Sequence, residues 1–360
     1  MNAMSGAPDR SAARRAREPG TPPRPLVVLA AAALVTGTGL AVWSLPATSD
    51  NRTGADRAPH AGSASPHLTR TAAGRPPDAA SPPAAAVRPS GFVAFVDPVR
   101  DPLSTLPGTA RRERPRWFTL GHLTAGQDGC TPVWGGPRRR GGDPVAAVLG
   151  RLRASGGDAG LAFGGRGGSE PAATCADLGR LTAAYRQVVG AFGVTYIDFE
   201  VEDPGGDETV LRRAGAIRAL QREAAAKGHP LTVSFTLPVT GTGLSPSDQA
   251  MLRSTREAGV DIAAVNLLAP IRHTPTGRTD LHQVALAVHA AHSQLSRTMG
   301  ETTAWHRVAL TAVLSGPRDL TVADARKLTA FTTRNGLAWL STRGAAPASD
   351  VARLLAALPH

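Results

Sequence analysis

Three carboxylates alternate along one apolar segment of the chain, Thr195–Val201 and the residue after it. The two-residue period of a β-strand places Asp198, Glu200 and Glu202 on a single face, with Tyr196 below them. Crowded carboxylates raise one another's pKa values, which can keep the outermost one protonated near neutral pH, as a general acid requires. The alternative is an exposed edge strand with a solvated acidic face, but three acids on an inner face favour a catalytic role.

The elements around this segment predict a parallel barrel. From about Gly91, short apolar runs alternate with longer amphipathic stretches, which is typical of repeated βα units. The eight predicted strands are Phe92–Val96, Trp117–His122, Ala159–Phe163, Thr195–Val201, Leu231–Leu237, Ile262–Leu268, Arg307–Val313 and Leu337–Ser341. The predicted helices are Pro144–Ala154, Ala176–Phe192, Glu208–Lys227, Pro246–Ala258, Leu281–Ser296, Val322–Arg334 and Ser349–Leu358. This order fits a (β/α)8 TIM barrel with its site at the carboxyl ends of the strands. An open doubly wound sheet is the alternative.

The sequence before the barrel predicts three further segments. Residues 1–25 are basic, and the apolar run 26–45 has about the ~20 residues that span a bilayer. Arginines before that run predict a cytoplasmic amino terminus and a single-pass membrane anchor. A cleaved signal peptide, and hence a secreted protein, is the competing interpretation. Residues 46–90 are rich in Pro and Ala and predict a disordered linker, so the barrel, residues 91–360, would lie outside the cytoplasm.

The composition excludes some classes of partner and site. The net charge is +12, with five arginines before the apolar run and a further run at Arg138 to Arg140. No aromatic residues interleave with these runs, so we expect no nucleic-acid binding. Cys130 and Cys175 are compatible with one disulfide or with two buried thiols. Neither has a second ligand at metal-binding spacing, so a zinc site is not expected. We expect a monomer.

The acidic segment resembles the fourth barrel strand of family 18 glycoside hydrolases, the chitinase-like family. Their strand carries Asp-Gly-x-Asp-x-Asp-x-Glu and ends with the catalytic acid. Asp198 matches the second family Asp and Glu202 the terminal Glu, whereas Glu200 replaces the third Asp. Other segments resemble the family in order, namely Trp134-Gly135-Gly136, Ala162-Phe163-Gly164-Gly165, Val233–Val239 and Val265-Asn266. The paired family cysteines imply a bridge between Cys130 and Cys175.

The resemblance implies substrate-assisted retaining hydrolysis of a glycan that contains N-acetylglucosamine, such as chitin. Glu202 would protonate the glycosidic oxygen while the substrate's own acetamide attacks the anomeric carbon. Glu200 would orient that acetamide, and Asp198 would support Glu200 from below. The resemblance implies no metal and no organic cofactor. Tyr196, Arg272, Trp134 and Trp339 are the candidate substrate-binding residues.

The sequence departs from the family at three places near this site. The family's Asp-Tyr pair after the sixth strand is replaced by Ile271 and Arg272, and Arg272 could pair with Glu200 or Glu202 and hold it ionised. Arg343 stands where the eighth strand usually supplies a Trp beneath the sugar, with Trp339 nearby. Glu200 is one methylene longer than the family Asp. A catalytically impaired, lectin-like barrel at the cell surface is therefore the alternative function, and an interaction or sensor scaffold is a third.

Two structural features would separate these functions. Tryptophans that line a groove would favour sugar binding, because aromatic rings stack on sugar faces, whereas buried tryptophans would have only a packing role. A groove closed by Arg272 or Arg343 would favour the scaffold. The tryptophans in question are Trp117, Trp134, Trp305 and Trp339.

Overall fold

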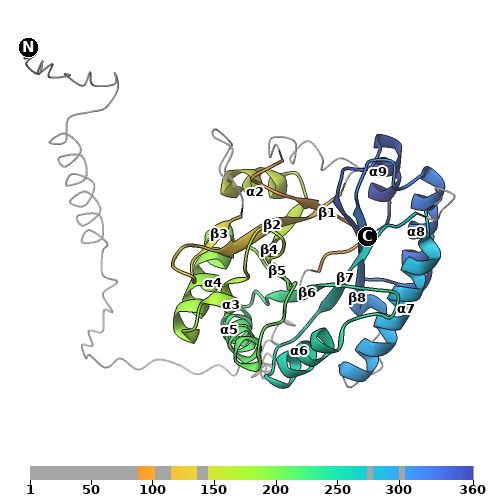
Figure 1. Cartoon of the computed structure of the whole chain (residues 1–360). Helices are drawn as coiled ribbons and strands as arrows, with labels where there is room; N and C mark the ends of the chain where they lie inside the picture. Colours follow the sequence, from red (N-terminus) through yellow and green to blue (C-terminus); the bar gives the residue numbers. More distant parts are fainter. Residues whose placement is uncertain (1–87, 102–114, 136–144, 274–278, 300–304, 360) are drawn as a thin grey trace, which may run out of the picture. The chain divides into compact units, whose positions relative to one another are not determined.

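Eight parallel β-strands close into a barrel in the computed structural model (Figure 1). The model describes residues 88–101, 115–135, 145–273, 279–299 and 305–359. The barrel strands are β1 (Phe92–Val96), β2 (Trp117–Ala125), β4 (Asp158–Gly164), β5 (Tyr196–Glu200), β6 (Thr232–Pro238), β7 (Ala264–Pro270), β8 (Val308–Leu314) and β9 (Leu340–Gly344). The ring closes because β1 pairs with both β2 and β9. The prediction of a (β/α)8 barrel is confirmed, and the open sheet is excluded.

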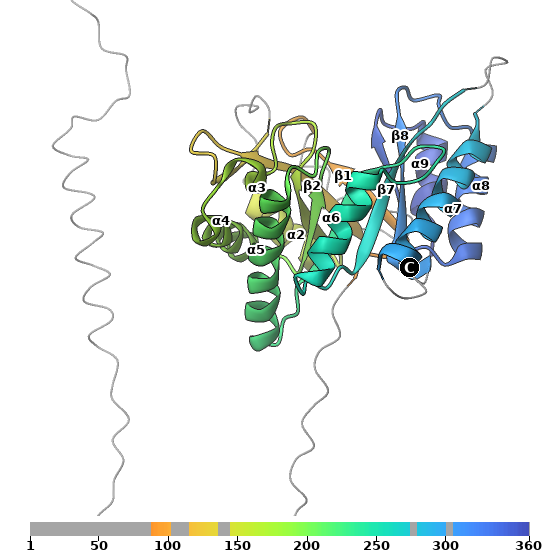
Figure 2. The same cartoon turned by 60° about the horizontal axis from the view of Figure 1, so that its bottom comes forward.

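Helices cover the outside of the strands, as Figures 1 and 2 show. They are α2 (Val145–Ala154), α3 (Pro171–Thr174), α4 (Leu178–Phe192), α5 (Asp207–Ala226), α6 (Pro246–Glu257), α7 (Leu281–Thr298), α8 (Val322–Asn335) and α9 (Ser349–Ala356), with a 3-10 turn at Trp305–Arg307. Side-chain caps define where three of these helices begin. The side chains of Asp177, Ser245 and Thr321 accept hydrogen bonds from the first turns of α4, α6 and α8. All seven predicted helices are present, with ends shifted by a few residues.

The barrel strand β5 separates an apolar outer layer from a polar interior. Phe199 points outward and stacks on Phe163 of β4 and Phe235 of β6, with ring centroids 5.4 and 5.6 Å apart. Asp198 and Glu200 point inward, and both are buried. The predicted alternation of side chains along this strand is therefore confirmed for Asp198 and Glu200. The packing of the outer face fixes the direction in which these two carboxylates point.

The sequence did not predict the short strand β3 (Pro132–Trp134) or the helix α3. The strand β3 lies antiparallel to β2 and has only three residues, too few for a periodic pattern. A disulfide joins Cys130, just before β3, to Cys175, at the end of α3. The bridge that the resemblance implied is therefore present, and the free-thiol alternative is excluded.

The predicted cytoplasmic segment, residues 1–25, and the predicted membrane anchor, residues 26–45, lie outside the described residues. So does the predicted linker, apart from its last three residues. In the part of the chain that the structure describes, no helix combines the length and the apolar character that a bilayer span requires.

Candidate active site

Asp198 lies deep in the barrel, where hydroxyl groups hold its carboxylate. Ser234 and Thr236, both on β6, donate to its two oxygens, Thr236 at 2.7 Å. The amide of Asn266 donates in turn to Thr236 at 3.0 Å. Burial raises the pKa of Asp198 to about 6, because the loss of solvation outweighs these hydrogen bonds. Asp198 can therefore exchange a proton in the weakly acidic range.

Glu200, the last residue of β5, lies nearer the carboxyl end of the barrel and has cationic or cationisable neighbours. Its Oε2 atom contacts Nε2 of His122 at 3.0 Å and accepts a hydrogen bond from Nη1 of Arg343. Burial alone would raise the pKa of Glu200, but the His122 hydrogen bond and the Arg343 charge outweigh it and lower that pKa to about 2. Glu200 is therefore ionised throughout the physiological pH range.

Glu202 follows the end of β5 and is the most accessible carboxylate of the three. Its side chain is 55% exposed, whereas that of Glu200 is 4% exposed. The nearest cation is Arg166, whose Nε lies 3.8 Å from Glu202 Oε1, and the Arg166 side chain is 90% exposed. An ion pair this open is weak. A ligand at the carboxyl end of the barrel can therefore reach Glu202.

Two glycines at the carboxyl end of β4, Gly164 and Gly165, leave space for the side chains around Glu200. Gly164 and Gly165 have φ angles of +86° and +79°, which side-chain-bearing residues rarely adopt. A Cβ atom on Gly165 would overlap the ring of His122 and would lie 3.0 Å from the Glu200 carboxyl carbon. The close approach of this loop to His122 and Glu200 therefore depends on glycine.

Comparisons with known proteins found relatives of this chain, although no family model matches it. The sequence is 26% identical over 180 residues, 49% of this chain, to a probable bifunctional chitinase/lysozyme of Escherichia coli strain K12. It is 29% identical over 119 residues, 32% of this chain, to endochitinase 11 of Metarhizium anisopliae. These matches cover 20% and 23% of the two relatives, so the chain spans about a fifth of the length of the curated relatives it matches.

The fold gives the same result. The catalytic domain of a hyperthermophilic chitinase from Pyrococcus furiosus superimposes with a TM-score of 0.61 and 21% sequence identity, over 75% of this chain and 95% of that one. The chain thus resembles chitinases in part of its sequence and in its fold. The two sequence matches support the family resemblance inferred from the motifs, and the structural match supports the (β/α)8 fold.

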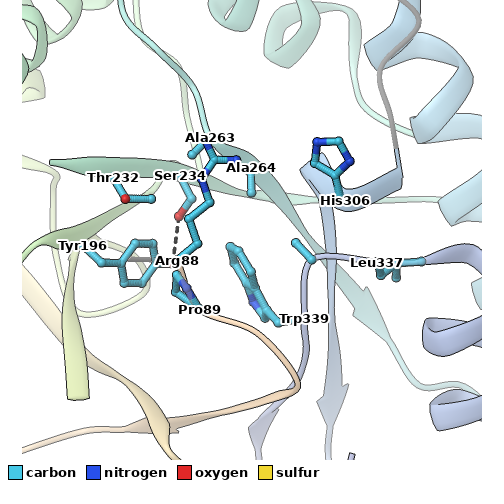
Figure 3. Close-up of a pocket in the computed structure, with 11 residues that line it drawn as sticks. Arg88, Pro89, Tyr196, Thr232, Ser234, Ala263, Ala264, His306, Leu337 and Trp339 are labelled. Carbon is cyan, nitrogen blue, oxygen red and sulfur yellow. Dashed lines mark hydrogen bonds between the residues drawn. The ribbon is translucent and has the colours of Figure 1, made fainter. Parts of the chain in front are cut away.

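In this chitinase-like barrel, Tyr196 and Trp339 lie at the end opposite Glu202. Both are buried, and their ring centroids are 6.0 Å apart. Together with Arg88 and His306 they line a pocket of about 210 Å³ at the amino ends of the strands (Figure 3). The hydroxyl of Tyr196 is 2.9 Å from that of Ser234, which donates to Asp198. Tyr196 thus supports the buried carboxylate from below, and the structure does not bring Trp339 to the exposed carboxylate.

The other two candidate substrate-binding residues also lie apart from Glu200. Trp134 is half-buried on β3 and packs edge-on against Phe192, with centroids 5.9 Å apart. Arg272 follows β7 and is exposed. The possible pairing of Arg272 with Glu200 is not found. Arg343 makes an ion pair with Glu200 instead, because its side chain extends from the end of β9 across the mouth of the barrel.

The tryptophans form no common groove in the described part of the chain. Trp117 and Trp339 belong to the packing at the amino end of the barrel. Trp305 stacks on His292 of α7, with centroids 3.8 Å apart.

His122 is a site residue that was not predicted from the sequence. A signal was present, because His122 is the last residue of a predicted strand, and active-site residues of a barrel emerge at that end of the strands.

Proposed function

We propose that this barrel is a chitinase-like glycoside hydrolase that acts on glycans containing N-acetylglucosamine. The observation that carries the proposal is the increase in exposure from the buried Asp198 and the ionised Glu200 on β5 to the accessible Glu202 just after it. General acid catalysis needs a proton donor that the glycosidic oxygen can reach. Glu202 is the residue of the three that meets this need, and the named relatives include chitinases.

The proposed mechanism is substrate-assisted and retaining, outside the usual two-carboxylate scheme. Glu202 gives its proton to the glycosidic oxygen as the bond to the leaving sugar breaks. The acetamide oxygen of the same substrate forms a bond to the anomeric carbon, and Glu200 accepts a hydrogen bond from the acetamide N–H. Water then opens this intermediate from the face that the leaving sugar vacated, and its proton goes to Glu202. Two inversions give net retention.

Replacing Glu202 tests this function. In the full-length protein we expect Glu202→Gln to lower the turnover of chitotetraose by ~10²–10⁴-fold, the usual contribution of a general acid. The substitution should leave the folded state intact, because the Glu202 side chain is mostly exposed. Hydrolysis is measured by product release between pH 4 and 8.

Asp203→Asn is the matched control, since Asp203 is the next residue, is also exposed, and bonds only the nearby amide of Gly205 in the described structure. It should retain turnover. Equal activity in Glu202→Gln and the wild type would rule out Glu202 as the acid.

The second candidate function is a glycan-binding barrel without turnover. The ion pair between Arg343 and Glu200 favours it, because a neutralised Glu200 gives less support to the positive charge that develops on the substrate. Calorimetry with chitotetraose separates the two candidates. Binding without product release would support the lectin-like function, and product release would support the hydrolase.

We also propose that the protein works outside the cytoplasm, either anchored through residues 26–45 or secreted after cleavage of that segment. The disulfide between Cys130 and Cys175 supports this location, because disulfides persist mainly in oxidising compartments. Mass spectrometry of the amino terminus of the protein recovered from cells would distinguish an intact anchor from a cleaved signal.

A further inference from the structure

Arg343 reaches from the end of β9 across the mouth of the barrel. Its guanidinium lies over the ring of Phe95 on β1, with Cζ 3.6 Å from the ring centroid. Its Nη1 atom donates to Glu200 and lies 3.0 Å from Nε2 of His122. The side chain is 14% exposed. Strands β1, β2, β5 and β9 thus meet at one guanidinium.

This contact changes what Glu200 can do for a substrate. An orienting carboxylate accepts the N–H of the acetamide and stabilises the positive charge that forms on the acetamide when its oxygen attacks. The positive charge of Arg343 opposes both effects. It compensates the negative charge of the ionised Glu200, and it repels the positive charge that develops on the acetamide. The other ionisable groups facing Glu200 are His122 on β2 and Asp198 on β5.

In the part of the chain that the structure describes, one hydrogen-bond donor of Arg343 has no partner in this position. Its Nε atom is buried and has no hydrogen-bond partner among the described residues, which costs free energy that a bound ligand or an outward movement can recover. Beneath the guanidinium, Asp198, Asn266 and Ser341 help to line a cavity of only about 10 Å³, room for one water at most. Arg343 therefore cannot withdraw into the barrel and can leave Glu200 only toward solvent.

We propose that Arg343 is a restraining residue of this site, whose guanidinium occupies Glu200 and must move outward before the acetamide of a glycan can bind that carboxylate. This inference rests on the proposed function and deepens it. Arg343 limits the rate of hydrolysis that the three carboxylates, Asp198, Glu200 and Glu202, can support. Removing its charge therefore frees Glu200.

The test compares Arg343→Gln with the wild type as full-length proteins. We expect the substitution to raise the pKa of Glu200, read by carbon-13 NMR of the glutamate carboxyls and assigned with Glu200→Gln. We also expect kcat/KM for chitotetraose to rise by about tenfold, the effect of removing ~1.4 kcal/mol from the barrier. A residue with only a structural role would not move both readouts upward.

Two further variants separate charge from general effects. Arg343→Lys keeps the charge, so it should leave the Glu200 pKa low and turnover near the wild-type value. Arg256→Gln removes an arginine on the exposed face of α6, away from the site, and should change nothing. An unchanged Glu200 pKa in Arg343→Gln, or a raised pKa with weaker binding and slower turnover, would overturn the restraining role.

Failure of the proposed hydrolase function can be distinguished from failure of the restraining role of Arg343. If neither the wild type nor Arg343→Gln hydrolyses chitotetraose, the hydrolase function fails, and calorimetry decides the role of Arg343. Tighter binding of chitotetraose by Arg343→Gln would then support restraint, and equal or weaker binding would contradict it.

Discussion

Asp198 and Glu200 are neighbours on one face of one strand, yet their pKa values shift in opposite directions. Asp198 has only hydroxyl partners at its carboxylate, so burial controls it and raises its pKa to about 6. Glu200 has Arg343 and His122, which outweigh burial and lower its pKa to about 2. The residues around each carboxylate, and not its depth alone, therefore set its protonation state.

Asp198 makes the stability of the fold depend on pH. Because its folded pKa is about 6 and its usual value is 3.8, the stability it contributes is full below 3.8 and is lost as pH rises toward 6. The loss should be about 3 kcal/mol, from 1.36 kcal/mol per pKa unit. Urea denaturation at pH 4 and pH 7 measures it. Asp198→Asn should lose less free energy of unfolding over this interval, and equal losses in the two proteins would contradict the assignment.

The acidic face of this site was predictable from sequence, but its ionic partners were not. The two-residue period placed Asp198 and Glu200 together because a strand fixes that alternation, whereas Glu202 lies beyond the end of β5. The partner of Glu200 depended on which strand ends meet across the barrel, a long-range property. The motif comparison therefore proposed Arg272 as the partner and treated Arg343 only as the replacement of a Trp. The three-dimensional arrangement shows that Arg343 pairs with Glu200.

At the scale of elements, the loop after β4 controls the geometry of β2 and β5. Gly164 and Gly165 bring this loop against Glu200 and His122, and the N–H of Gly165 donates to the Glu200 carbonyl at 3.0 Å. The predicted strands and helices were all found because each has a clear apolar period. Strand β3 and helix α3 were missed since three or four residues carry no period.

Substituting Gly165 tests how this loop contributes. Gly165→Ala should destabilise the protein by about 1–2 kcal/mol, because φ is positive there. It should also displace His122 from Glu200 and slow turnover by about 100-fold, as a shift of ~1 Å near the chemistry can do. The control is Gly167→Ala, whose added Cβ would lie 3.6 Å from its nearest neighbour. Equal stability and turnover in the two variants would refute this role.

At the scale of the whole molecule, one disulfide and one buried ion pair secure the same side of the barrel. Cys130 and Cys175 join β3 to the end of α3 across a sequence separation of 45 residues. Glu170 caps the start of α3 and accepts from the buried Arg213 of α5 at 2.8 Å. Both connections stabilise the segments that follow β2 and β4, close to His122 in β2 and Gly165 after β4.

Removing the disulfide should cost about 2–4 kcal/mol of the free energy of unfolding, mainly because the unfolded chain gains freedom. The Cys130→Ala, Cys175→Ala double variant, compared with the wild type in guanidinium with and without reductant, measures this loss. Reductant should lower the stability of the wild type alone. A wild type that reductant does not affect would contradict the assigned stabilisation.

The closure of the barrel has a consequence for how the chain folds as it is made. Strand β1 pairs with β2 but also with β9, whose partner residues Leu340, Ser341 and Thr342 lie near the end of the sequence. Until β9 has been synthesised, one edge of β1 has no partner, and unpaired edges promote aggregation. The pairing of Phe92 with Leu340 therefore gives the barrel contacts of high sequence separation, so it should fold slowly.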